Sequence, residues 1–178
     1  MEATTLIERL RRDHERVLRD ITELEGALVR SAPATRGAAA EERIGSVLAM
    51  LERQFQTHMA AEDQILYPAI SRAIPASAPS LEPLHDEHAE LRQMLHRLQA
   101  TLGEPKSADR DEQIPIQVHD LADLLRLHIR KEESLVFHVA ARLLADEEIA
   151  AVLKRMNGDA DAAGAETRKP LLKKGSSR

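Results

Sequence analysis

The sequence predicts an all-α protein: an up-down-up-down four-helix bundle with a short fifth C-terminal helix and a disordered tail. Three observations predict this fold. Apolar residues recur at intervals of three and four along four long segments, which is the spacing of a helix that buries one face. Glycine and proline gather between these segments, where they indicate short connections between antiparallel neighbours. Only three of the 178 residues are aromatic, which disfavours an all-β fold.

The first two helices are expected at about residues 4–30 and 39–73, on either side of a connection that ends at Gly37. The buried seam of the first helix consists of Ile7, Leu10, His14, Val17, Ile21, Leu24 and Leu28. The seam of the second consists of Ile44, Leu48, Leu51, Phe55, His58, Glu62, Ile65 and Ala69.

The third and fourth helices are expected at about residues 80–102 and 114–144, and Pro115 marks the start of the fourth. The seam of the third consists of Leu81, Leu84, His88, Leu91, Leu95, Leu98 and Leu102. The seam of the fourth consists of Val118, Leu121, Leu125, His128, Glu132, Leu135 and Val139.

A fifth helix over Asp146–Met156 is expected to end at Asn157–Gly158, since asparagine and glycine commonly follow the last helical turn. The bundle domain is therefore placed at residues 1–157. Residues 158–178 are rich in Ala, Gly, Lys and Ser, which predicts a disordered basic tail.

Composition excludes several classes of function. The chain has no cysteine, which rules out thiolate metal sites, disulfides and a cysteine nucleophile. A net charge of -5 and few aromatic residues argue against a nucleic-acid partner. No apolar run approaches a membrane span and no signal-peptide pattern is present, so a cytoplasmic protein with no membrane partner is expected.

The chain also contains an internal repeat. RRDHERVL around His14 is similar to HDEHAELR around His88, at an offset of 74 residues. HMAAEDQILYP, which begins at His58, is similar to HIRKEESLVFH, which begins at His128, at an offset of 70 residues. This pattern indicates a duplicated helical hairpin.

Six polar residues interrupt the otherwise apolar seams: His14, His58, Glu62, His88, His128 and Glu132. A rise of about 1.5 Å per residue places them roughly 12–18 Å from helix ends that meet at one end of the bundle, so all six share one level. Imidazole and carboxylate together suit iron, manganese or zinc, and this set suffices for two ions about 3.5–4 Å apart. The alternative is a metal-free network of histidine–glutamate ion pairs, which carries a high desolvation cost.

The order of these residues, with LYP after the first His-x-x-x-Glu pair, resembles the hemerythrin family, and most closely the bacterial hemerythrin-like HHE cation-binding domains. The resemblance covers roughly residues 5–144. It implies a cofactor of two non-haem iron ions with an oxo or hydroxo bridge. One iron would be held by His14 and His58, the other by His88 and His128, with Glu62 and Glu132 bridging.

The chain departs from the oxygen-carrying members in its third helix. Those proteins have a His-x-x-x-His pair there, whereas Leu84 and Arg92 occupy the positions four residues from His88. His85 is three residues away and is a candidate fifth ligand, a partner of a ligand, or a surface residue. The carriers also place a carboxylate at the position of Glu133; the internal repeat favours Glu132 instead.

The remaining polar candidates are given structural roles. Asp13 and Glu87 are predicted to be surface charges because they point about 100° away from the histidines that follow them. Tyr67 lies about 180° around a regular helix from His58, which favours packing over a phenolate ligand. His138 is placed at the rim of the site, and the last two histidines, His96 and His119, on the surface.

Three classes of function remain open. The first is redox chemistry with hydrogen peroxide, dioxygen or nitric oxide, which would need an electron donor. The second is an oxygen or iron sensor, carrier or store without turnover. The third is a bundle whose metal serves only to hold the fold.

Overall fold

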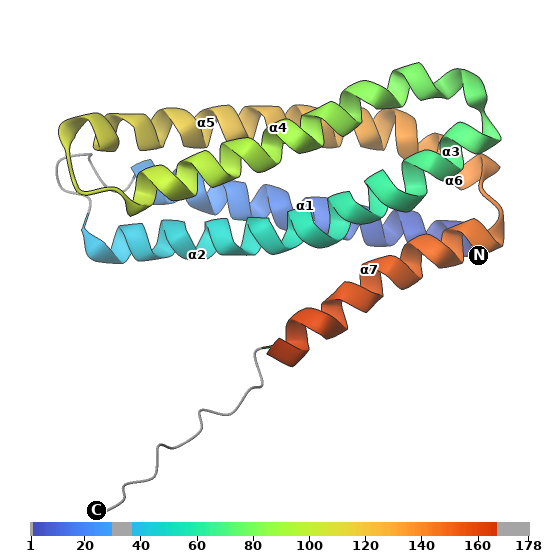
Figure 1. Ribbon diagram of the computed structural model, residues 1–178, viewed down its shortest axis with the longest axis horizontal. Coiled ribbons are helices and arrows are strands. Elements are labelled where there is room, and N and C mark those ends of the chain that lie inside the picture. The colour runs from blue at the N-terminus through green and yellow to red at the C-terminus, as the bar shows by residue number, and fades with distance from the viewer. Residues whose placement is uncertain (1, 30–36, 167–178) are drawn as a thin grey trace, which may run out of the picture.

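The structure, a computed structural model, describes residues 2–29 and 37–166, and the regular elements of those residues are all helical (Figure 1). The predicted fold class is confirmed. The α-helices are α1 (Glu2–Val29), α2 (Ala38–Gln54), α3 (Tyr67–Ala73), α4 (Ala78–Gly103), α5 (Ala108–Lys131), α6 (Phe137–Leu143) and α7 (Asp146–Glu166). No helix in this part of the chain is long and apolar enough to cross a membrane.

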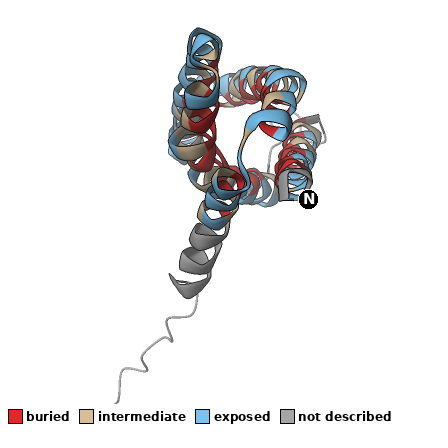
Figure 2. Cartoon of the chain, turned by 90° about the vertical axis from the view of Figure 1, so that its right-hand side faces the viewer, coloured by how far each residue is buried: buried red, intermediate tan, exposed pale blue. Residues whose placement is uncertain are grey.

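Four rods make the bundle: α1, α2 continued by α3, α4, and α5 continued by α6. Each rod lies beside two others, so α1 and α4 both contact α2 and α5. Seen end on in Figure 2, the buried residues face inward. The core consists of two apolar clusters, one on each side of the level at which the six seam residues lie. A polar layer is therefore enclosed between two apolar cores, which exclude water from it.

The second and fourth rods contain π-helical turns where sequence analysis expected regular α-helix. These turns are Phe55–Met59, Glu62–Leu66 and Glu132–Val136. A π turn closes i→i+5 hydrogen bonds, so it inserts one extra residue and rotates every later side chain backward. Such turns occur frequently at functional sites, and here they contain His58, Glu62 and Glu132.

The extra residue shifts the buried seam by one position beyond each site. Leu135, predicted to be buried, is 45% exposed, and Val136 is buried in its place. In the same way Leu66 is buried where Ile65 was expected. In these two rods the predicted seam is therefore correct up to the glutamates and moves by one residue directly after them, while Ala69 is buried as predicted.

Helix α5 begins at Ala108, so the predicted start at 114 is wrong and Pro115 lies inside the helix. Ser107 supplies the N-cap, because its Oγ accepts a hydrogen bond from the backbone N–H of Arg110 at 3.2 Å. The buried guanidinium of Arg110 donates to the carbonyl oxygens of Thr101 and Leu102 at the end of α4. The N-cap at Ser107 and the hydrogen bonds of Arg110 fix the start of α5 at Ala108, whereas the proline alone predicted a start six residues later.

Helix α7 continues to Glu166, so its predicted end at Asn157–Gly158 is also wrong. Asparagine and glycine lower helix propensity by up to about 1 kcal/mol each but do not forbid a helix. The apolar side of α7, with Ile149, Val152 and Met156, is buried in the second core cluster. Residues 167–178 of the predicted disordered tail lie outside the described residues, and the proposed domain boundary stays a prediction.

Candidate metal centre

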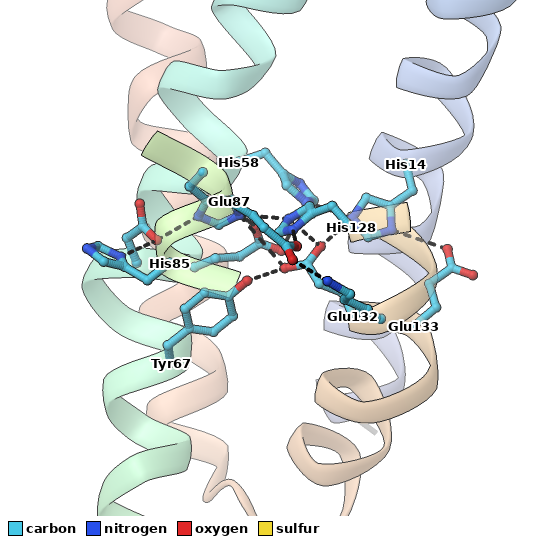
Figure 3. Close-up of polar contacts among 12 residues, drawn as sticks. His14, His58, Tyr67, His85, Glu87, His128, Glu132 and Glu133 are labelled. Atoms are coloured by element: carbon cyan, nitrogen blue, oxygen red, sulfur yellow. Dashed lines mark hydrogen bonds and ion pairs between the residues drawn. The ribbon is translucent and has the colours of Figure 1, made fainter. Parts of the chain in front are cut away.

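The structure brings together all six polar seam residues at one level of the bundle. Figure 3 labels four of them: His14, His58, His128 and Glu132. Their exposed fractions range from 0 to 7%, so the cluster is withdrawn from water. Donor atoms of the first group lie within 4.8 Å of one another, and so do those of the second. The first group is His14, His58, Glu62 and Glu132; the second is His88, His128 and Glu132. These six residues are called the His/Glu cluster below.

The four histidines form two pairs whose ring nitrogens face each other. Nε2 of His14 lies 3.1 Å from Nε2 of His58, and these two residues are called the first pair. Nε2 of His88 lies 2.9 Å from Nε2 of His128, and these form the second pair. The two pairs come from the two halves of the internal repeat, so the cluster has an approximate two-fold symmetry.

A carboxylate lies at the other ring nitrogen, Nδ1, of every cluster histidine. Glu133 accepts from His14 at 3.2 Å, Asp63 from His88 at 2.6 Å and Glu87 from His128 at 2.9 Å, whereas Asp13 lies 3.6 Å from His58. These four are called the outer carboxylates. Asp13 is buried and Glu87 is bonded to His128, so the prediction that both are surface charges was wrong.

The error has a simple cause. A residue beside a ligand in sequence points about 100° away from it, and in a bundle that direction leads to the neighbouring helix rather than to solvent. Asp13 precedes His14 in sequence but lies at Nδ1 of His58. Glu87 precedes His88 but accepts a hydrogen bond from Nδ1 of His128. The internal repeat could have revealed these carboxylates. Asp13 and Glu87 are 74 residues apart, and Asp63 and Glu133 are 70 apart, which are the two offsets of the repeat.

The chemistry of this donor set fits a cation. Where Nδ1–H donates to a carboxylate, as in His14, His88 and His128, Nε2 keeps its lone pair and can direct it at a cation. Among the described residues, neither carboxylate oxygen of Glu62 nor Oε2 of Glu132 has a hydrogen-bond partner, and all three atoms are buried. Nε2 of His58 lies 3.0 Å from Oε1 of Glu62, but without the orientation of a hydrogen bond. Positive ions between these atoms would satisfy all of them.

The electrostatics of the cluster agree with this. Burial by itself lowers the pKa of His58, but the nearby Glu62 carboxylate and Asp13 outweigh burial and raise the pKa to about 10. Burial would raise the pKa of Glu132, but His14 and His128 hold it well below its usual range. The cluster therefore favours positive charge beside Glu62 and Glu132, and a metal would displace protons from it.

Tyr67 also belongs to the site, although a regular helix would turn it away. Its ring stacks on His88, with centroids 5.7 Å apart, and its hydroxyl donates a short hydrogen bond to Oε1 of Glu132. Burial and then the carboxylates of Glu62 and Glu132 raise the pKa of Tyr67 far above its usual range. The two π turns between His58 and Tyr67 supply the rotation that brings the ring inward.

Phe137 occupies the repeat position equivalent to Tyr67 and stacks on His14, with ring centroids 5.2 Å apart. It has no hydroxyl, so Glu62 receives no counterpart of the hydrogen bond that Tyr67 gives to Glu132. The approximate symmetry of the site is broken at this position.

The other candidate residues lie outside the cluster. The side chain of His85 is 61% exposed and its Nδ1 bonds to Asp63, so it contacts the partner of a cluster histidine and not the cluster itself. Glu133 reaches Nδ1 of His14 from the outside, whereas Glu132 lies inside. The other three histidines, His96, His119 and His138, are exposed.

A small cavity of about 20 Å³ borders the first histidine pair, together with His128 and Glu132. The rest of its wall is mostly apolar: Val17, Gln54, Phe55, Met59, Leu125 and Ile129. A cavity of this size holds one or two water-sized molecules. The bundle can thus receive a small molecule beside the side chains of the first pair without opening.

Residues 5–140 match the family described as the hemerythrin HHE cation-binding domain. The chain belongs to this family. The residues matched by this cation-binding family include the whole His/Glu cluster, whose members could hold a metal ion.

Among curated proteins, the chain is 26% identical over 135 residues to a protein named DNA nickase from Nostoc sp. (strain PCC 7120 / SAG 25.82 / UTEX 2576). The match covers 69% of this chain and 36% of that protein. The chain thus spans about a third of the length of this relative.

Proposed function

We propose that the His/Glu cluster of this HHE domain holds two non-haem iron ions and that the site reacts with hydrogen peroxide, dioxygen or nitric oxide. The observation that carries the proposal is the 20 Å³ cavity against the first histidine pair. It gives a molecule of two or three atoms a place against the side chains of His14 and His58, and it is too small for a larger substrate.

Two ions are proposed because the facing histidine pairs give two separate points of converging lone pairs. The two glutamates lie between these points. Oε1 of Glu62 is 3.0 Å from His58 and its Oε2 is 3.5 Å from His88, so this carboxylate can serve both ions. Iron is proposed over zinc because the family resemblance implies it and because redox chemistry needs it. When bound, the iron pair supplies electrons and open coordination positions.

The position of His85 supports reaction over simple carriage. Because its ring bonds to Asp63 and is mostly exposed, each ion would have only two imidazoles from the chain. Fewer protein ligands leave more positions for an incoming molecule.

The chain's own residues have separate tasks in this proposal. The apolar wall of the cavity, including Val17 and Met59, excludes bulk water and favours small neutral molecules. Three of the outer carboxylates, Glu133, Asp63 and Glu87, accept from the imidazoles and fix their orientation. Tyr67 holds its proton on the phenol oxygen and directs it at Oε1 of Glu132.

The DNA nickase name belongs to a relative of which the chain matches 36%. With a net charge of -5, the chain has no excess of the basic residues that DNA binding needs, and we propose small molecules as its partners, with an electron donor for turnover.

The experiment is to add peroxide, nitric oxide or air to the iron-loaded protein in stopped-flow mixing and to follow the visible spectrum and the consumption of the oxidant. We expect consumption of at least one of the three. A band that appears in air and vanishes under argon over many cycles, with no turnover, would show a carrier or sensor instead.

A matched pair of variants tests the role of the cavity. Val17→Leu extends a cavity-lining side chain, and Val47→Leu makes the same change in the apolar core away from the cavity. We expect unchanged iron content in both and a slower reaction only in Val17→Leu. Equal rates in the two variants would contradict entry through this cavity.

A further inference from the structure

The two histidine pairs offer a metal ion the same kinds of donor. Each pair supplies two imidazoles, and Glu62 and Glu132 lie between them. Oε2 of Glu132 is 3.2 Å from Nε2 of His14 and 3.4 Å from Nε2 of His128. Glu62 lies 3.0 Å from Nε2 of His58 and 3.5 Å from Nε2 of His88, so the first donor group has four residues and the second has three. The histidines differ more clearly in what orients their rings.

The second pair is firmly anchored from outside. Oδ1 of Asp63 accepts from His88 at 2.6 Å and from His85 at 2.9 Å, while its Oδ2 accepts from Arg92 at 2.9 Å. Glu87 accepts from His128 through one oxygen and from Lys131 through the other. The side chains of Asp63 and Glu87 are only 11% and 13% exposed, so water competes little for these hydrogen bonds.

The first pair is held more loosely. Asp13 lies 3.6 Å from Nδ1 of His58, and that buried nitrogen has no hydrogen-bond partner in residues 2–29 and 37–166. The two oxygens of Asp13 accept instead from Arg9 and Arg16 at 3.2 and 3.3 Å. Glu133, the partner of His14, has a side chain that is 39% exposed, and within the described part of the chain it has no second side-chain hydrogen bond.

Net charge does not account for a difference between the pairs. Two outer carboxylates and two basic side chains surround each of them: Arg9 and Arg16 for the first, Arg92 and Lys131 for the second. Long-range attraction for a cation is thus similar at both. The contrast lies in hydrogen-bond geometry, with two good bonds behind the second pair and one partly exposed bond behind the first.

From this contrast we propose that the two metal positions are unequal. The position at His88 and His128, which Asp63 orients together with Arg92 and His85, has the higher affinity and fills first. The position at His14 and His58 has the lower affinity and fills second. The inference rests on the proposed two-ion site. Losing one outer partner of a ligand histidine changes metal affinity about 10–100-fold, so we expect the two affinities to differ at least about 10-fold. The weaker position is also the one whose two histidines both border the cavity.

The test is an anaerobic titration of the metal-free full chain with Co²⁺, followed by calorimetry and visible absorption. We expect two equivalents to bind in two resolved steps. Asp63→Asn should weaken the first step about 10–100-fold and leave the second unchanged. Asp123→Asn, at an aspartate whose side chain is 83% exposed, is the matched control and should change neither step.

Two further variants assign the steps to the pairs. His14→Ala should keep the tight step and lose the weak one, whereas His88→Ala should lose the tight step. Arg92→Gln keeps Asp63 but removes one of its anchors, so it should weaken the first step by less than Asp63→Asn does. It tests the inference if Asp63→Asn does not fold.

The NMR signals of Co²⁺-bound imidazoles provide a readout that a purely structural role would not move. The Nδ1–H resonance of His88 should exchange faster with water in Asp63→Asn, and Asp63→Glu should restore it in part. Unchanged exchange would show that Asp63 does not orient this ring and would overturn its role.

The outcomes separate this inference from the proposed function. Two ions that bind with equal affinity, or a tight step that is lost in His14→Ala, would overturn the inequality and leave the two-ion site standing. Fewer than two ions bound at saturation would overturn the proposed two-ion site, and the inference with it.

Discussion

Removing the hydroxyl of Tyr67 should destabilise the protein without disturbing its packing. In Tyr67→Phe the ring remains and can still stack on His88 at a centroid distance of 5.7 Å. What is lost is the hydrogen bond to Oε1 of Glu132. Because Glu132 is fully buried and its pKa lies well below the usual range, the acceptor is ionised and has no water to replace the donor.

A hydrogen bond to a charged group contributes about 1.5–3 kcal/mol, so the free energy of unfolding should fall by about that amount. The assay is urea unfolding of the metal-free protein, since bound metal breaks two-state behaviour. With an m-value of about 2 kcal/mol per molar urea, the midpoint should drop by roughly 1 M at an unchanged slope.

Ser46→Ala is the control, because it removes an exposed hydroxyl that donates to the backbone oxygen of Glu42. Its effect should stay within about 0.5 kcal/mol. An equally small effect of Tyr67→Phe would refute the hydrogen bond to a buried charge. A visible band of the iron-loaded wild type that Tyr67→Phe abolishes would instead show that the phenol binds iron.

Three further predictions concern the fold. Asp20 is buried, and its Oδ2 has no hydrogen-bond partner in the part of the chain that the structure describes. Burial and then Glu23 raise its pKa, so its charged form destabilises the fold at pH values above 3.8. Asp20→Asn should raise the unfolding free energy by about 1 kcal/mol at pH 7, and urea titrations should show the gain vanish as pH falls below 3.8. Leu98→Ala, in the core beyond the site, should lower the free energy of unfolding by about 2–5 kcal/mol and leave the metal content unchanged. Ser107→Ala should lower it by about 0.5–2 kcal/mol by removing the N-cap of α5, and an unchanged melting temperature would contradict that role.

Much of this structure could be predicted from the spacing of apolar residues alone. The four rods and the shared level of the His/Glu cluster follow from helical period and rise. Two of the predictions that failed depended on regular helical geometry. Leu135 and Tyr67 were both misplaced because π turns add residues that periodicity does not reveal.

The outer carboxylates were missed for a different reason. A sequence shows which residues share a helix face, but Asp13 and Glu87 act across the gap between two helices. Predicting that requires the packing of neighbours as well as the period of one helix. The spacing of these acids between the two halves of the internal repeat indicates their role, because it equals the spacing of the histidines.

The central claim is that the His/Glu cluster binds a pair of metal ions bridged by glutamate. The most direct test is the amount of iron bound per chain after anaerobic loading with Fe²⁺ and removal of excess metal. The wild type should bind two, and Glu132→Ala should lose iron from both positions, while Glu82→Ala, at an exposed glutamate of α4, should still bind two. One iron per chain in the wild type, or two in Glu132→Ala, would contradict the account.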